Sequence, residues 1–179
     1  MEHHINSRET VYSARAFKIE RVGMTLPDGR ETVYDLVAHP GAVTIVPLDD
    51  ESNVYFVRQY RLGAEQSLLE LPAGTRIPDE TPEACAGREI REETGMAAGK
   101  LTLVGDFYMA PGYSSEHMYV YLATQLSRAP LAQDDDEFIA VETIPFEKVM
   151  EMVRQNQIND GKSLASLLLV EPYVKYDRK

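Results

Sequence analysis

The sequence has a single cysteine, no long apolar run and no excess of positive charge. With Cys85 alone, no disulfide can form within one chain, which agrees with a reducing compartment. No apolar stretch approaches the roughly 20 residues that a membrane-spanning helix needs, and residues 1–6 lack a basic and then apolar signal segment. We therefore expect a cytoplasmic protein without a membrane partner.

Positive charge is scarce, because 18 Lys and Arg residues stand against 29 Asp and Glu residues, for a formal net charge of −11. This balance argues against a broad surface for the phosphate backbone of nucleic acid, so we expect no nucleic-acid partner. The remaining composition, with 44% hydrophobic and 26% charged residues among 179, is that of an ordinary folded protein. A length of 179 residues is enough for one compact domain with a small appendage.

The apolar patterning and the turn residues predict several strands. Near the N-terminus a hairpin is expected, because Pro27 and Gly29 suit a turn between two extended runs. Strands are expected over residues 10–22, 31–38, 42–48, 54–60, 68–71, 101–109, 117–124 and 138–144.

One helix has clear start and stop signals. The hydroxyl of Thr81 followed by Pro82 suits a helix start, and Gly95 suits a helix end, so a helix is expected at 82–94. Apolar periodicity predicts further helices at 145–155 and 163–170. Strands with helices between and after them predict an α/β layered domain.

Three glutamates share one face of the helix expected at 82–94. Glu89, Glu92 and Glu93 stand at i, i+3 and i+4, so their carboxylates crowd together. Like charges at these spacings destabilise a helix unless something compensates. A hard divalent cation would compensate, because magnesium takes oxygen ligands.

The alternative is a solvated acidic face whose charges pair with Arg88 and Arg91. Two features favour a metal site instead. The helix follows a Pro-Ala-Gly turn at 72–74, and another acid, Glu80, stands just before it.

Nine residues around this helix match a known pattern. They are Gly74, Glu80, Arg88, Glu89, Ile90, Glu92, Glu93, Gly95 and Met96. The segment 74–96 thereby resembles the Nudix box. The resemblance implies the Nudix fold for residues 41–179, an α/β/α sandwich around a mixed sheet, preceded at 1–40 by an antiparallel β-hairpin region. It also implies an enzyme that hydrolyses a diphosphate joining a nucleoside to another group.

The same resemblance implies roles for the box residues. Glu89, Glu92, Glu93 and the backbone carbonyl of Ala73 would hold two or three Mg²⁺ ions, for which Mn²⁺ can substitute. Arg88 would orient the acids through ion pairs. The resemblance therefore predicts Glu92 and Arg88 as catalytic residues.

A Pro-Gly segment beyond the box narrows the branch of the family. Residues 110–116 resemble the Pro-Gly…Glu signature of ADP-ribose pyrophosphatases, and Pro111 lies fifteen residues after Met96. The resemblance implies that Gly112 and Glu116 contact the substrate. The alternative is a simple Pro-Gly turn.

The run Val57–Arg61 resembles a strand-end motif that brings an arginine to the phosphates. Arg61 matches that residue best, whereas Arg58 contacts the substrate, solvent or another subunit. A guanidinium suits a diphosphate because two N–H donors can meet two phosphate oxygens. The alternative is that these are ordinary charged residues at the end of a strand.

An acidic run at 133–137 resembles the loop that delivers a general base in these enzymes. Glu137 is the predicted base, with Asp136 as the rival. The alternative is a solvated loop without a catalytic role.

The resemblance extends to residues 39–43, 71–74 and 160–163, and more loosely to the N-terminal hairpin. In this branch the hairpin exchanges between subunits, so a homodimer is implied. The implied reaction is hydrolysis of ADP-ribose, or a similar ADP-sugar, to AMP and a sugar phosphate. The alternatives are a pyrophosphatase for another nucleotide sugar such as GDP-mannose, or a non-catalytic Nudix domain that senses a nucleotide. An RNA cap hydrolase fits the acidic charge poorly.

Overall fold

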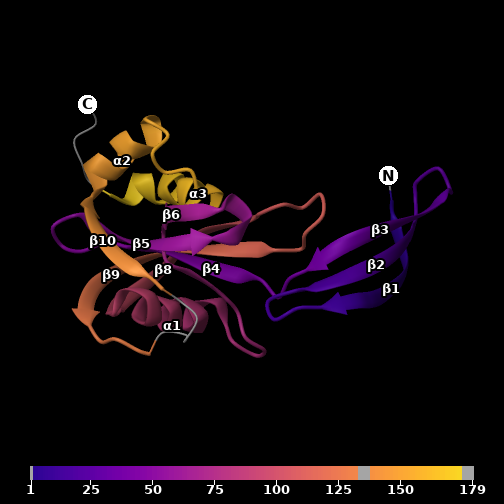
Figure 1. The fold of residues 1–179 in the computed structure, drawn as a ribbon, viewed down its shortest axis with the longest axis horizontal. Helices are drawn as coiled ribbons and strands as arrows, with labels where there is room; N and C mark the ends of the chain where they lie inside the picture. The colour runs from indigo at the N-terminus through magenta and orange to yellow at the C-terminus, as the bar shows by residue number, and fades with distance from the viewer. Residues whose placement is uncertain (1, 133–137, 175–179) are drawn as a thin grey trace. The chain divides into compact units, whose positions relative to one another are not determined.

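The computed structural model describes residues 2–132 and 138–174 (Figure 1). The chain divides into two compact units. One comprises Met1–Gly41 with Phe107–His117, and the other comprises Ala42–Asp106 with Met118–Lys179. The predicted role of residues 1–40 as a dimerisation element stays a prediction.

The first unit contains an antiparallel sheet of three strands in the order β1-β2-β3. These strands are β1 (His4–Ser13), β2 (Lys18–Thr25) and β3 (Glu31–Ala38). The turn between β2 and β3 is the predicted one, and the N–H of Gly29 donates to the carbonyl of Leu26 at 2.9 Å.

The prediction of one strand over residues 10–22 is wrong. The chain reverses after β1, where the N–H of Ala14 donates to the carbonyl of Phe17 at 2.9 Å. This turn contains neither glycine nor proline, the residues that usually mark a turn in a sequence. The N-terminal region is consequently a three-stranded sheet rather than a single hairpin.

Two sheets form the second unit. A mixed sheet has the order β7-β4-β9-β8, with β4 parallel to β9 and antiparallel to β7. An antiparallel sheet has the order β10-β5-β6. The strands are β4 (Ala42–Pro47), β5 (Asn53–Arg61), β6 (Gln66–Glu70), β7 (Ala73–Thr75), β8 (Met96–Tyr108), β9 (His117–Arg128) and β10 (Ala140–Pro145). The short strand β7 was not predicted.

Three α-helices accompany these strands in the described part of the chain: α1 (Pro82–Thr94), α2 (Phe146–Arg154) and α3 (Gly161–Val170). Short 3-10 turns occur at Leu62–Ala64 and Glu171–Tyr173. No described helix is long and apolar enough to cross a membrane.

The limits of α1 are confirmed. The Thr81 hydroxyl accepts a hydrogen bond from the N–H of Ala84 at 3.2 Å, and Gly95 ends the helix with φ of 73°, a conformation that favours glycine. Helix α3 begins two residues earlier than predicted, because the Asp160 carboxylate accepts from the N–H of Ser163 at 3.0 Å and caps the first turn.

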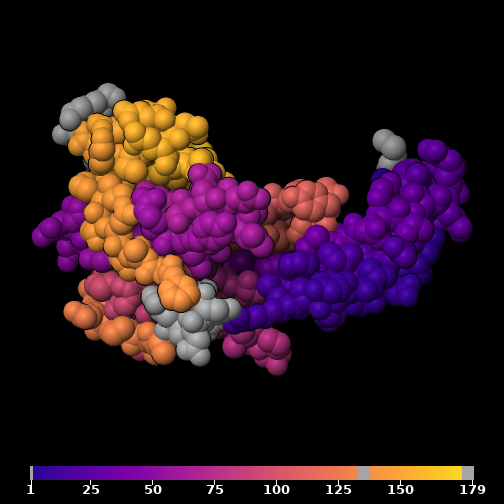
Figure 2. All heavy atoms as spheres, viewed as in Figure 1, coloured from indigo at the N-terminus to yellow at the C-terminus, as the bar shows by residue number. Residues whose placement is uncertain are grey.

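Strand β4 has helices on both of its faces. Val43 and Ile45 belong to a buried cluster with Ile90 of α1. On the other face, Val46 belongs to the cluster that contains Phe146 and residues of α3. Figure 1 shows α1 on one side of the strands and α2 with α3 on the other, and Figure 2 shows the yellow and orange atoms of the latter pair directly against purple atoms of β5 and β6. The predicted α/β/α sandwich around a mixed sheet is confirmed.

Candidate active site

The turn before β7 lies directly against the acidic face of α1. The Glu93 carboxylate accepts a hydrogen bond from the N–H of Ala73 at 3.0 Å. A Cβ atom on Gly74 would lie 1.8 Å from the carboxyl carbon of Glu89, so any side chain at this position would force the Glu89 carboxyl group to move. Both glutamates are buried, with 8% of Glu89 and 3% of Glu93 exposed. Two carboxylates and the backbone of the turn therefore share one small space.

A single guanidinium, that of Arg88, contacts three acids. Its Nη1 lies 2.6 Å from Oε1 of Glu89 and 2.8 Å from Oε2 of Glu92. Its Nε and Nη2 donate to the two carboxylate oxygens of Glu80 at 2.9 and 3.0 Å. These bonds raise the pKa of Arg88, with the Glu80 bond as the largest cause, and they lower the pKa of Glu80.

The two arginines that could have paired with a solvated acidic face differ in their contacts. Arg88 does pair with the acids, but those acids are largely covered rather than solvated. Arg91 instead donates from Nε to the carbonyl of Ala129 at 2.8 Å. Of these two arginines, Arg88 therefore supplies the compensating charge at Glu89 and Glu92.

The loop between β7 and α1 is also fixed. The Arg76 side chain donates twice to the Glu80 carbonyl, at 3.1 and 2.6 Å, and the N–H of Ile77 donates to the Glu80 carboxylate at 3.2 Å. Cys85 is buried beneath this loop, and desolvation raises the pKa of its thiol. A buried thiol with a raised pKa suits packing rather than nucleophilic chemistry.

The donor chemistry of this region suits a hard divalent cation. Within the described residues, no three His, Cys, Asp or Glu side chains already surround a common metal position. Glu89 and Glu92 both accept from Nη1 of Arg88, and Glu93 accepts from the N–H of Ala73. The available atoms are nevertheless carboxylate and backbone oxygens, which are the ligands that magnesium prefers.

Arg61, at the end of β5, is held by a residue that the sequence reasoning missed. Its Nε and Nη2 donate to the two oxygens of Glu70 at 2.9 and 2.8 Å. The bond to Glu70 is the largest cause of the raised pKa of Arg61, and the charge of Glu93 adds to it. Arg61 therefore lies within electrostatic reach of the acids on α1.

The signal for Glu70 was present in the sequence. It is an acid between Leu69 and Leu71, in a segment where both leucines are buried. A lone carboxylate in such a strand must be paired, because an unpaired buried charge is very costly. Its partners, Arg61 and Lys162, could not be named from this pattern.

The other three residues predicted to bind substrate are Arg58, Gly112 and Glu116. Arg58 forms a partly exposed ion pair with Glu142 of the neighbouring strand β10, at 2.6 Å. Gly112 and Glu116 belong to the first compact unit, where the N–H of Tyr113 donates to the carbonyl of Ala110 at 3.0 Å and closes the Pro-Gly turn. Their contact with substrate stays a prediction. The predicted base Glu137 and its rival Asp136 lie outside the described residues.

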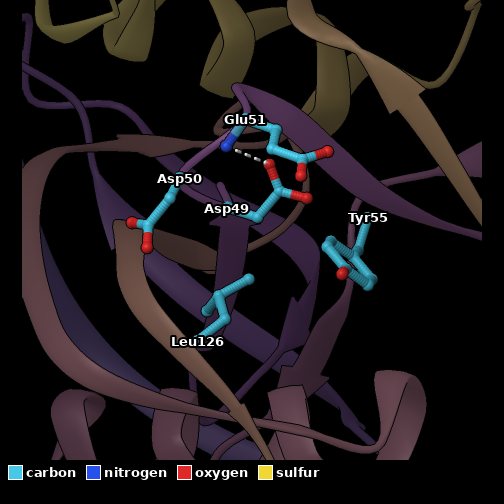
Figure 3. Close-up of a pocket in the computed structure, with 5 residues that line it drawn as sticks. All are labelled: Asp49, Asp50, Glu51, Tyr55 and Leu126. Atoms are coloured by element: carbon cyan, nitrogen blue, oxygen red, sulfur yellow. Dashed lines mark hydrogen bonds between the residues drawn. The ribbon is translucent and has the colours of Figure 1, made fainter.

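A surface hollow is lined by Asp49, Asp50, Glu51, Tyr55 and Leu126 (Figure 3). Its acids belong to a turn, in which the Asp49 carboxylate accepts from the N–H groups of Glu51 and Asn53 at 3.0 and 2.8 Å. This turn follows the end of β4, whereas Ala73 pairs with Thr44 near the start of that strand. Thr44 and Asp49 are five residues apart, about 17 Å along an extended chain. The hollow is therefore not the site at α1.

Comparison with known proteins agrees with this geometry. The NUDIX domain family matches residues 38–167. The chain is 34% identical to an ADP-ribose pyrophosphatase of Bacillus subtilis (strain 168), over 88% of this chain and 86% of that protein. It is also 34% identical to a GDP-mannose pyrophosphatase of Enterobacter sp. (strain 638), over 77% of this chain and 75% of that protein.

A solved structure described as an ADP compounds hydrolase superposes with a TM-score of 0.84 at 30% identity, covering 97% of this chain and 94% of that one. The chain belongs to the Nudix family of hydrolases, and the family predicted from the box is confirmed.

Proposed function

We propose that this protein hydrolyses the diphosphate of ADP-ribose, or of a similar ADP-sugar, to AMP and a sugar phosphate. One observation carries the proposal: the acids of the box are held together at one place. Glu89 and Glu92 accept from Arg88, and Glu93 accepts from the N–H of Ala73. Every acid of the box is present, which favours catalysis over nucleotide sensing. The relative named ADP-ribose pyrophosphatase, matched over most of both chains, supports this substrate class.

Divalent cations are part of the proposal. The carboxylates of Glu89, Glu92 and Glu93 and the carbonyl of Ala73 would hold two or three Mg²⁺ ions, with Mn²⁺ able to replace them. Bound cations would supply charge neutralisation and Lewis acidity at the diphosphate. Arg88 keeps the acids close together against their mutual repulsion, which the burial of Glu89 and Glu93 would otherwise strengthen.

Other side chains would bind and activate the reactants. Arg61 offers the part of its guanidinium that Glu70 does not use to the phosphate oxygens. Glu137, or Asp136 in its place, would take the proton of the attacking water. Contacts of Arg58, Gly112 and Glu116 with the substrate complete the proposed site.

We also propose a homodimer formed through the sheet β1-β2-β3. Every residue of β1 is exposed, and large apolar side chains of this sheet face solvent in one chain. They include Ile5, Val11, Tyr12, Val33 and Tyr34, which are 43% to 61% exposed. Covering such side chains favours association. Sedimentation analysis would show one dimeric species, and a monomer at micromolar concentration would contradict this part of the proposal.

We also propose a cytoplasmic location, which fits the lone cysteine.

A substrate panel tests the reaction. The protein is incubated with ADP-ribose, other ADP-sugars and GDP-mannose in Mg²⁺, in Mn²⁺ and in a chelator, and the products are separated. We expect AMP and ribose phosphate from ADP-ribose, with no turnover in chelator. If GDP-mannose were preferred, the proposed substrate would change from an ADP-sugar to GDP-mannose, in line with the relative named GDP-mannose pyrophosphatase. Tight binding of ADP-ribose with no turnover in either metal would instead indicate a sensor.

Substitutions then test the residues. Glu93→Gln should retain the fold, because the amide oxygen can still accept from the N–H of Ala73, but it should lose nearly all activity. A near-normal rate would remove Glu93 from the metal site. For the base, Glu137→Gln and Asp136→Asn are compared, and a loss below about tenfold in both would exclude this role.

A further inference from the structure

Lys162 is a buried cation that none of the reaction steps uses. Lys162 lies at the start of α3, and only 10% of its side chain is exposed. Its Nζ contacts the carboxylate of Glu70 and lies 2.9 Å from Oδ2 of Asp160. Burying an ammonium group is costly unless it is paired, so these two contacts are required for Lys162 to occupy this place.

Glu70 connects Lys162 to Arg61. The Glu70 side chain is 1% exposed, and all its described partners are cations. Oε1 accepts from Nε of Arg61, whereas Oε2 accepts from Nη2 of Arg61 and from Lys162. The fork of two parallel bonds fixes the plane of the Arg61 guanidinium. Nη1 is the part of that guanidinium that Glu70 does not hold, and 41% of the Arg61 side chain remains exposed.

The charges of this cluster are balanced. Arg61 and Lys162 carry two positive charges, and Glu70 and Asp160 carry two negative charges. Without Lys162 the cluster would be net negative, and the Glu70 carboxylate would depend on Arg61 alone. An anionic diphosphate would then approach a negative cluster instead of a neutral one with an exposed cationic edge.

The cluster is tied to the turn that carries the predicted metal ligand. Glu70 ends β6, three residues before Ala73. The N–H of Leu71 between them donates to Oγ of Ser163 at 2.7 Å, and this hydroxyl donates to Asp160 at 2.6 Å. The start of α3 is thereby fastened to the chain between β6 and β7, just before the residues Ala73 and Gly74 that lie against α1.

We propose that Lys162 is a positioning residue for the substrate arginine. By sharing the Glu70 carboxylate, it fixes the guanidinium of Arg61 toward the diphosphate and leaves the charge of Arg61 available for phosphate oxygens. The inference rests on the proposed function for its substrate, but the placement of Arg61 can be measured without any substrate.

The first test is a double-mutant cycle with ADP-ribose and Mg²⁺. Lys162→Met should lower kcat/KM roughly tenfold to a hundredfold, mostly through KM, because a misplaced binding group loses this much. Lys162→Arg should restore most of it. In an Arg61→Ala background, Lys162→Met should change kcat/KM less than about twofold, since Lys162 acts through Arg61. Full, additive losses in that background would overturn the inference.

Loss of stability needs a matched control, because Lys162→Met removes a buried contact. Leu167→Ala is this control. Leu167 lies in the same helix and is fully buried, but it packs in the apolar core and forms no side-chain hydrogen bond to the cluster. It should lower the unfolding temperature while the kcat/KM of the folded enzyme stays near that of the wild type. An equal loss of kcat/KM in Leu167→Ala would overturn the inference, because general loosening of α3 would then explain the data.

The second test needs no activity. Exchange of the Arg61 Nε–H proton with water is measured by NMR in the full chain, with Arg61→Lys used to assign the signal. Slow exchange in the wild type and fast exchange in Lys162→Met support the inference, and equal exchange overturns it. If the wild type hydrolyses no nucleotide sugar, the proposed function fails and this measurement decides the placement of Arg61 by itself.

Discussion

The carboxyl group of Glu89 occupies the space that a side chain on Gly74 would need. A Cβ atom at Gly74 would lie 1.8 Å from the carboxyl carbon and from Oε1 of Glu89, far inside van der Waals contact. The Glu89 carboxyl group can therefore keep this place only with glycine at residue 74, because any other side chain would displace it. The same approach lets the neighbouring Ala73 donate to Glu93.

Substitution of Gly74 by alanine should displace Glu89 and disturb the site more than the fold. We expect Gly74→Ala to reduce kcat/KM by roughly a hundredfold, since small displacements of reacting groups cost about this much. Steady-state kinetics with the preferred nucleotide sugar, together with circular dichroism, would measure both effects.

Gly63 provides the control. A Cβ there would meet no atom within 4 Å in the described structure, so Gly63→Ala should leave the rate unchanged. Full activity in Gly74→Ala would show that the Glu89 side chain can adopt another position, and that catalysis does not need its close contact with residue 74.

Replacement of Arg88 by lysine should weaken the site although the charge is kept. A lysine has one ammonium group and cannot form the forked contacts to Glu80, Glu89 and Glu92 together. We expect the free energy of unfolding in urea to fall by about 1–3 kcal/mol, because partly covered acids lose hydrogen bonds. Activity should fall with it, since the acids repel one another. Arg91→Lys, on the same helix but bonded to a carbonyl, should cost little activity. Equal losses in both variants would contradict the special role of Arg88.

Local signals in the sequence were enough for α1 and for the box. Thr81, Pro82 and Gly95 marked the helix correctly, because caps and end residues act through neighbouring backbone groups. The spacing of the glutamates placed them on one face for the same local reason. The turn after β1 was missed, since residues 13–17 include neither glycine nor proline.

The cluster around Glu70 was missed for a different reason. Lys162 follows Glu70 by 92 residues, and no local rule relates residues at that distance. The pairing exists because α3 packs across the sheet and brings its first turn to the end of β6. The motif at 160–163 was noticed as part of a resemblance, but its contacts required the folded chain.

The Ser163 hydroxyl should contribute measurably to stability. It is fully buried, accepts from the N–H of Leu71 at 2.7 Å and donates to Asp160 at 2.6 Å. Ser163→Ala would leave the N–H of Leu71 without this partner, so we expect a loss of about 1–3 kcal/mol in the free energy of unfolding.

Ser166 is the matched control on the same helix. Its hydroxyl is also buried, but it finds no hydrogen-bond partner among the residues that the structure describes. Ser166→Ala should therefore be neutral or slightly stabilising. Urea unfolding of both variants would check the pair, and a larger loss in Ser166→Ala would reverse the assignment.

The contact of Glu80 with Arg88 should make stability depend on pH in the acid range. The bond from Arg88 is the largest cause that holds the pKa of Glu80 below its ordinary value of 4.5. A carboxyl whose pKa is lower in the folded than in the unfolded chain stabilises the fold above the unfolded value, and this contribution is lost as pH falls through the folded value. At neutral pH, Glu80→Gln should thus be less stable than the wild type, and the difference should shrink as pH falls below 4.5. Urea unfolding midpoints from pH 7 to pH 3 would measure this difference, with the exposed Glu65→Gln as control. A difference that stays constant over this range would mean that the charge of Glu80 does not stabilise the loop before α1.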